Sequence, residues 1–280
     1  MVRRKACRGE LPVSLQEKIE ILVVLAASGE EESQSSAFHT LQSWPSEELQ
    51  LVLSDPTAPV DVLDFVAKNL APDRVELADA LLRNPNLPGP LGEWLESTVA
   101  LIAEAESSES SEGSVPVPVS GESGGSSREE VQEKPLTTLQ KTQRMSVVEK
   151  VKAALLGTME ERMILVRDSN KLVSRAVMQS PKLSEHEAES YASMKDIPED
   201  VLRLLALNRR FRKTYVVIRA LVNNPRTPID VSLQLLPRIN DPDLKGLASN
   251  RNVPDVIRHS AEKMIQRKEE AAKTKIPGKH

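Results

Sequence analysis

Aromatic residues and cysteine are scarce in this sequence. Of its 280 residues, three are Phe, two are Trp and two are Tyr, and Cys7 is the one cysteine. A single cysteine excludes an intrachain disulfide and any all-cysteine metal or iron–sulfur site within one chain. Ligand clefts commonly recruit aromatic rings. A core of Leu, Val, Ala and Ile therefore favours many short, closely stacked helices over a small-molecule cleft.

Long apolar runs are also missing. No stretch approaches the roughly 18 consecutive apolar residues of a membrane-spanning segment. The apolar run 19–27 follows a basic N-terminus as in a signal peptide, but Lys18 and Glu20 interrupt the pattern. We expect an amphipathic helix here, begun by a capping box of Ser14 and Glu17. We also expect a cytoplasmic protein with no membrane contact.

The motifs that mark common enzymes are a third absence. The sequence contains no Gly-rich phosphate loop, no helical pair of metal-binding histidines and no paired catalytic carboxylates. Residues 121–125 match the G-x-S-x-G pattern, yet a nucleophile elbow needs a strand before it and a helix after it, and neither is expected there. We therefore predict no enzymatic activity, no cofactor and no metal.

Two groups of residues around histidines could suggest acid–base chemistry. One lies at a predicted helix start, where carboxylates favour the helix dipole, and the other has the i, i+4 spacing of an exposed pair. We expect structural roles for both. The groups are His186 with Glu185, Glu187, Ser190 and Tyr191, and His259 with Asp255.

Charge is divided unevenly along the chain. The net charge is −4 from 37 basic and 41 acidic residues. Residues 201–280 hold 17 basic and 7 acidic residues, a net charge of +10, which leaves 20 basic and 34 acidic residues, a net charge of −14, for residues 1–200. Such a division allows contact between the two parts, or a partner that is acidic.

Helical periodicity broken by Pro, Asn and Asp runs through most of the chain and predicts an all-α fold. One stretch differs, because it is rich in Ser, Glu, Gly and Pro and cannot bury enough apolar surface to offset chain entropy. The predicted divisions are an N-terminal helical repeat segment at 10–103, a disordered linker at 104–135, a basic helical repeat domain at 136–268 and a frayed charged tail at 269–280.

A nine-residue helix joint recurs. It reads small residue, two apolar residues, a polar residue, Asn or Ser, and then Pro at the sixth and ninth positions in three of four copies. The copies are Ala80–Pro88, Ala176–Ser184, Ala220–Pro228 and Gly246–Pro254, with looser versions at Leu51–Pro59 and Ser190–Pro198.

The joint has a physical reading. The small residue lets helices approach, Asn can leave a helix in a left-handed conformation, and Pro suits the first turn of the next helix. The closing prolines recur at 59 and 88, and at 198, 228 and 254, so the intervals are 29, 30 and 26 residues. Such periods predict an α-solenoid of helical hairpins. The residues expected to shape the joints are Asn84, Pro85, Pro88, Pro181, Asn224, Pro225, Pro228, Asn250 and Pro254.

Two strings carry a family resemblance: VELADALLRNPNLPGPLGEWL at 75–95 and VVIRALVNNPRTPIDVSLQLL at 216–236. They resemble leucine-rich repeat variant units and, more loosely, HEAT-like repeats. The first family implies a right-handed superhelix of short α and 3₁₀ helices. Some of its members carry an iron–sulfur cluster, which one cysteine cannot hold. The resemblance implies a scaffold and no particular reaction.

Basic residues are concentrated after Asn208. Stacked basic helices can follow a phosphate backbone, which makes nucleic acid a candidate partner. Base stacking has little support, because only Phe211 and Tyr215 lie nearby. A solvated helix face, or a dock for the acidic part of the chain, accounts for the same residues. The candidate binding residues are Arg209, Arg210, Arg212, Lys213, Arg219, Arg226 and Arg251, on one predicted ridge with Arg203, Arg238, Lys245 and Arg258.

The sequence as a whole predicts a non-catalytic scaffold that binds a protein partner through its C-terminal repeats. A nucleic-acid-binding solenoid that uses the same basic face is the alternative.

Overall fold

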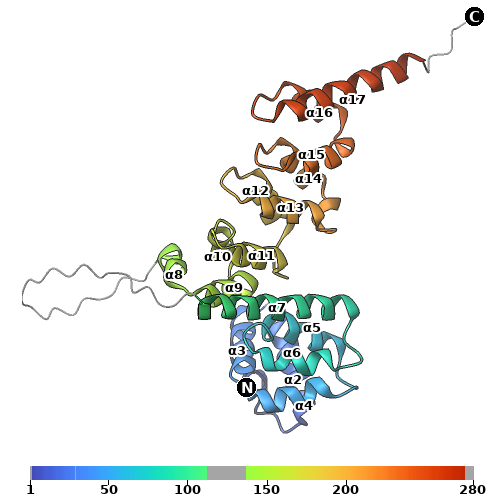
Figure 1. The fold of residues 1–280 in the computed structure, drawn as a ribbon. Coiled ribbons are helices and arrows are strands. Elements are labelled where there is room, and N and C mark those ends of the chain that lie inside the picture. The colour runs from blue at the N-terminus through green and yellow to red at the C-terminus, as the bar shows by residue number, and fades with distance from the viewer. Residues whose placement is uncertain (1, 29, 112–136, 275–280) are drawn as a thin grey trace, which may run out of the picture. The chain divides into compact units, whose positions relative to one another are not determined.

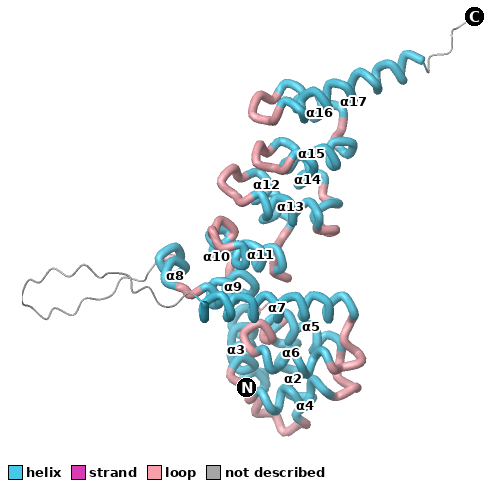
Figure 2. The backbone as a smooth tube through the Cα atoms, in the orientation of Figure 1, coloured by secondary structure: helices cyan, strands magenta, loops and turns pink. Residues whose placement is uncertain are grey.

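The computed structural model describes residues 2–28, 30–111 and 137–274 (Figure 1). These residues form seventeen α-helices and two 3₁₀ helices, with no strand among them (Figure 2). The all-α prediction is confirmed. The G-x-S-x-G pattern at 121–125 and the predicted linker beyond Ser111 lie outside the described residues.

The helices divide into two units. The first unit contains α1 (Val2–Cys7), α2 (Leu15–Ala26), α3 (Glu31–Gln42), α4 (Ser46–Ser54), α5 (Val60–Asn69), α6 (Val75–Leu82), α7 (Gly89–Ser111) and α9 (Val147–Leu156). The second contains α8 (Thr138–Arg144), α10 (Met159–Leu165), α11 (Lys171–Gln179), α12 (Glu185–Ser193), α13 (Glu199–Leu207), η1 (Phe211–Lys213), α14 (Tyr215–Asn223), α15 (Ile229–Leu235), η2 (Leu236–Arg238), α16 (Asp241–Ser249) and α17 (Asp255–Thr274).

The first unit is built on an aliphatic core. Helix α2 packs on α3, α4 packs on α6, and α7 packs on α5 and α6. The capping box at the start of α2 is present, because the Ser14 side chain accepts the Glu17 N–H while the Glu17 carboxylate accepts the Ser14 N–H. Leu22, Leu53 and Leu63 are among its completely buried side chains.

Tertiary packing moves three of the expected boundaries. Helix α1 precedes the expected start at residue 10, and Thr40 Oγ1 donates 2.7 Å to the Cys7 carbonyl that ends it. Helix α7 continues from the predicted limit at 103 to Ser111, because Ala105 stays buried and Glu109 accepts the N–H of Val148 at 3.0 Å. Helix α9, expected within the domain at 136–268, belongs to the first unit because it packs on α7.

The charged tail expected from residue 269 is also partly helical. Helix α17 runs to Thr274, and Lys268 forms an ion pair with Asp241 of α16 just before the predicted boundary. Among the residues of this helix whose burial is described, Ala261 is the last buried apolar one, and the helix extends beyond it.

The second unit repeats one pattern of contacts. Helix α11 packs on α13, α12 packs on α14 and α15 packs on α17, so in these three pairs a helix contacts the second one after it (Figure 1). Two ion pairs follow the same interval. Lys171 of α11 lies 3.2 Å from Asp200 of α13, and Arg203 of α13 lies 2.7 Å from Asp230 of α15.

The joint asparagines act differently from the prediction. Asn224 and Asn250 have φ of −83° and −79°, so the left-handed conformation expected for them is wrong. Asn84 Nδ2 instead donates to the carbonyls of Leu53 and Asp55, at 2.6 and 2.9 Å. These carbonyls end α4, where helical C=O groups lack internal partners. The asparagine is thus a cap for a helix about one repeat earlier.

Asn224 repeats this arrangement in the second unit. Its Nδ2 donates to the carbonyls of Ala192 and Met194, both at 2.7 Å, at the end of α12. Its Oδ1 accepts the N–H of Arg226 at 2.9 Å, which turns the chain. Asn84 and Asn224 are each 4% exposed, and their bonds to Leu53 and Ala192 are formed away from water.

The prolines that close the joints lie one residue earlier than expected. Pro228 is the N-cap of α15, and Pro88 and Pro254 directly precede α7 and α17. Thr227 makes no cap bond, and its buried Oγ1 has no hydrogen-bond partner.

The copy Ala176–Ser184 is out of phase with the others. It connects α11 to α12, whereas Ala220–Pro228 connects α14 to α15 and the looser copy Ser190–Pro198 connects α12 to α13. Connections at the two ends of a helix pair both need a small residue, an apolar pair and a helix stop. The sequence pattern alone cannot tell them apart.

Candidate functional site

A basic surface of the described residues begins at the corner between α13 and α14. Asn208 turns the chain there, because its Oδ1 accepts the Arg210 N–H at 2.9 Å. Phe211 follows in η1 and is 2% exposed. Since this ring enters the core, the neighbouring side chains of Arg209, Arg212 and Lys213 extend into solvent.

These three side chains line a groove of about 730 Å³ that also touches α13, α15 and η2. We call it the basic groove. Its other charged residues are Arg203 and Arg238, and one carboxylate, Asp230. Five cations against one carboxylate give the lining a net charge of +4.

The carboxylate in the groove is already neutralised. Arg203 donates to both oxygens of Asp230, at 2.7 and 3.2 Å. This hydrogen bonding, ahead of the charge of Arg203, holds the pKa of Asp230 below its ordinary value, and the same contact raises the pKa of Arg203. Within the described residues, no carboxylate pairs with Arg209, Arg212, Lys213 or Arg238.

Apolar atoms form the floor of the groove. Ala206, Val231 and Leu235 are buried there, and Leu207 beside them is 62% exposed. No Phe, Trp or Tyr side chain lines the groove, although Phe211 lies beneath the same corner. The surface can bind anions and aliphatic groups, and it holds no nucleophile or acid–base pair.

The remaining predicted binding residues lie elsewhere. Arg210 donates 3.0 Å to the carbonyl of Leu183, and its guanidinium lies 5.4 Å from the ring centroid of Phe211. This side chain therefore ties two corners together. Arg219 lies 3.7 Å from Asp243 and lines a second, mixed-charge groove.

Arg226 and Arg251 are exposed in the joints after α14 and α16. Helix α14 has nine residues and so spans about 13 Å between the corner that holds Arg209 and the joint that holds Arg226. The described residues do not bring all seven candidates into one groove. Of the seven candidates, only Arg209, Arg212 and Lys213 come together.

Arg203 and Arg238 complete the groove, yet the sequence assigned them only to the general ridge. Arg238 lies in η2, at the corner between α15 and α16. This corner corresponds to the Arg209–Lys213 corner one helix pair earlier. Arg238 could have been predicted from the sequence by working out at which end of a helix pair each loop lies.

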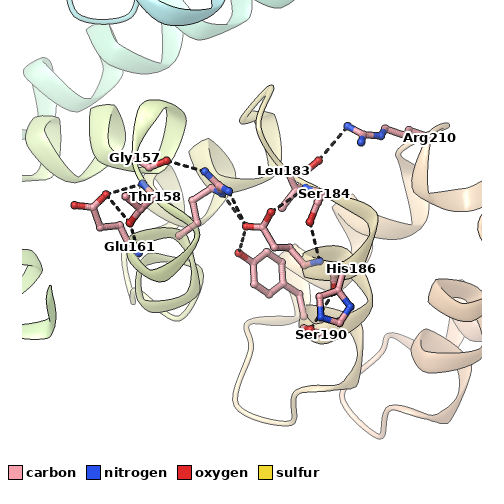
Figure 3. Close-up of polar contacts among 11 residues, drawn as sticks. Gly157, Thr158, Glu161, Leu183, Ser184, His186, Ser190 and Arg210 are labelled. Atoms are coloured by element: carbon pink, nitrogen blue, oxygen red, sulfur yellow. Dashed lines mark hydrogen bonds and ion pairs between the residues drawn. The ribbon is translucent and has the colours of Figure 1, made fainter. Parts of the chain in front are cut away.

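A buried ion pair lies at the other end of the second unit (Figure 3). Arg162 Nε donates 2.9 Å to Glu187 Oε1, with side chains that are 5% and 2% exposed. Arg162 also donates 2.8 Å to the carbonyl of Gly157, which Figure 3 shows beside Thr158. The second oxygen of Glu187 accepts the N–H of Ser184 at 2.9 Å.

Tyr191 lies against the same carboxylate, its hydroxyl oxygen 3.5 Å from Glu187 Oε1. Burial first, and then the negative charge of Glu187, raise the pKa of this hydroxyl well above its ordinary value. His186 points away from the pair and is exposed, and Ser190 Oγ donates to its carbonyl (Figure 3). The group holds α10 to α12 and offers no open acid–base site.

The second histidine group also differs from its expected pairing. His259 Nδ1 lies 2.8 Å from the backbone carbonyl of Asp255, while the carboxylate of Asp255 pairs with Arg258. In the part of the chain that the structure describes, no three His, Cys, Asp or Glu residues are grouped to hold a metal ion. None of the described helices is long and apolar enough to span a membrane.

No protein-family model, curated protein or solved structure matches this chain. The chemistry of the basic groove is therefore the main guide to function.

Proposed function

We propose that this protein is a non-catalytic, cytoplasmic scaffold built as an α-solenoid, and that it binds a protein partner through its second unit. The solenoid is supported by contacts between a helix and the second one after it, which recur in the pairs α11–α13, α12–α14 and α15–α17. It is also supported by asparagine caps that reach back 31 and 32 residues, from Asn84 to Leu53 and from Asn224 to Ala192. Stacked units of this kind form extended binding surfaces.

The observation that carries the proposal is the composition of the basic groove. Arginine is enriched in protein–protein interfaces, and an interface core combines apolar contact with a polar rim. Here Leu207 and the aliphatic floor lie among four cations that pair with no carboxylate in the described part of the chain. A protein surface with acidic and aliphatic side chains matches both features.

Nucleic acid is the second candidate, because the same four cations could follow a phosphate backbone. The aliphatic lining disfavours single strands, whose bases stack on aromatic rings. Phosphate contacts of this kind weaken steeply between about 50 and 200 mM salt.

A photo-crosslinking experiment tests the proposal. A photoreactive residue replaces Gln234 in the groove of the full-length chain, or Gln266 of α17 outside it, and extracts of the native host are irradiated. We expect protein adducts from the groove probe that disappear when Arg209 and Arg212 are changed to Glu. Adducts with nucleic acid alone, or the same protein adducts from both probes, would overturn the proposal.

A further inference from the structure

We infer that the basic groove binds an extended acidic peptide that carries an aliphatic side chain between its carboxylates. This inference rests on the proposed function and names the chemistry of the partner. It draws on the positions of the cations, the exposed leucine and the locked carboxylate.

The cations surround the groove from more than one element. Arg209, Arg212 and Lys213 come from the corner before α14, and Arg238 comes from a second element of the lining, η2. Guanidinium groups bind carboxylates through two parallel N–H donors, which fixes the direction of approach as well as the charge. A ligand with carboxylates at several positions along an extended chain can engage both sides at once.

The apolar part of the groove selects against a purely electrostatic ligand. Leu207 is 62% exposed, and the nearby side chains of Ala206, Val231 and Leu235 are already packed into the core. Covering Leu207 with an aliphatic side chain removes apolar surface from water, which favours binding. Sugar and phosphate groups cannot provide that contact, and no aromatic ring in the lining offers a base a stacking surface.

The ion pair Arg203–Asp230 reduces the repulsion between the groove and an acidic ligand. Because Asp230 is held by two hydrogen bonds from Arg203, its charge does not oppose an incoming carboxylate as a free carboxylate would. Gln234 also lines the groove, and its amide can both donate to and accept from a peptide backbone. The groove therefore has partners for the carboxylates, the side chain and the main chain of a peptide.

The test measures binding of fluorescent peptides to the purified full-length protein by anisotropy. The probe peptide alternates Asp or Glu with Leu. One matched peptide replaces Leu by Ser, a second replaces the acidic residues by Asn and Gln, and single-stranded RNA and duplex DNA serve as phosphate ligands. Measurements are made at about 50 and about 200 mM salt.

We expect the probe peptide to bind, the Leu-to-Ser peptide to bind about fivefold more weakly, and the uncharged peptide not to bind. Arg209→Glu with Arg212→Glu should weaken binding about tenfold or more. The matched control, Arg226→Glu with Arg251→Glu, changes the net charge equally at the other end of the helices and should bind as the wild type does. Leu207→Ser should match the loss seen with the Ser peptide, while Leu51→Ser, at a leucine of the first unit that is 70% exposed, should have no effect.

Each alternative result is decisive. Equal binding of the Leu and Ser peptides, or equal loss from both pairs of Arg variants, overturns the inference. RNA or DNA that binds more tightly than the peptide and retains its affinity at the higher salt concentration overturns it as well. A groove probe at position 234 that traps a protein through a neutral segment overturns the acidic ligand while leaving the scaffold intact, whereas nucleic-acid adducts alone would remove both.

Discussion

The corner before α14 and the joint after it contain the same turn. Asn208 Oδ1 accepts the N–H of Arg210, and Asn224 Oδ1 accepts the N–H of Arg226, both at 2.9 Å. Beyond the turn the two differ. Asn224 is buried and its amide caps α12, whereas the corner after Asn208 buries Phe211 and leaves three cations in solvent.

The two turns therefore have different roles, since one stabilises the fold and the other presents side chains to a ligand. At the joint, every polar group of the asparagine side chain is used inside the protein, which leaves nothing for a ligand. At the corner, Phe211 and the Arg210–Leu183 hydrogen bond fix the loop, and among the described residues no carboxylate pairs with Arg209, Arg212 or Lys213. The same local turn therefore serves stability in one place and recognition in the other, and variants at the two sites should affect different measurements.

Removing one partner of the buried ion pair should give the largest change in the free energy of unfolding. Arg162→Met leaves the Glu187 carboxylate buried and unpaired, so we expect a loss of about 3–5 kcal/mol in the free energy of unfolding. Urea denaturation monitored by circular dichroism measures it. The exposed control Arg226→Met should change stability by no more than about 0.5 kcal/mol.

A second variant checks the cause of that loss. Adding Glu187→Gln to Arg162→Met removes the buried charge but retains an oxygen for the Ser184 N–H. We expect it to recover much of the stability. A double variant that is as unstable as Arg162→Met would show that packing, rather than the unpaired charge, causes the loss.

The second-largest expected effect is a difference in stability loss between variants of Asn224 and of Asn208. Asn224→Ala removes two hydrogen bonds to the end of α12 as well as the turn bond, and we expect a loss of about 2–4 kcal/mol. Asn208→Ala removes the turn bond alone and should cost about 1 kcal/mol or less. Equal losses in thermal or urea unfolding would mean that the joint and the corner are energetically alike.

Removing the ion pair in the basic groove should give the smallest change in stability. The pKa of Asp230 is lower in the folded chain than its ordinary value of 3.8, so the pair stabilises the fold above that value. This contribution is lost as the pH falls through the lower, folded-state pKa. Asp230→Asn should therefore reduce the dependence of stability on pH in the acid range only. A wild type and variant with parallel stability curves from neutral to acid pH would contradict this.

The sequence predicts much of the fold because its local signals act over a few residues. The capping box at Ser14 and the helix stops before Pro228 and Pro254 are formed by neighbours in the chain, and they appear where expected. The short α1 and the last turns of α7 were missed, because Cys7 and Glu109 are held by residues 33 and 39 positions away. No local pattern records such contacts.

The candidate site was less predictable. The basic run at Arg209–Lys213 is plain in the sequence, but whether Arg226 or Arg238 lies beside it depends on which end of a helix each loop occupies. The out-of-phase copy at Ala176–Ser184 hid that alternation. Arg162 gave no signal at all, since a buried arginine and an exposed one look the same in a helical pattern.

The sequence by itself determined an all-helical chain, its joints and an excess of positive charge near the C-terminus, because helix propensity, proline and net charge are local or additive properties. Only the tertiary structure decided that Asn84 and Asn224 cap distant helices, that Arg162 and Glu187 are buried together, and that three of the seven candidate arginines and lysines share a groove with Arg203 and Arg238. The first two features join residues that are 25 to 32 positions apart in the chain. These interactions contribute to stability only after the helices have packed against one another.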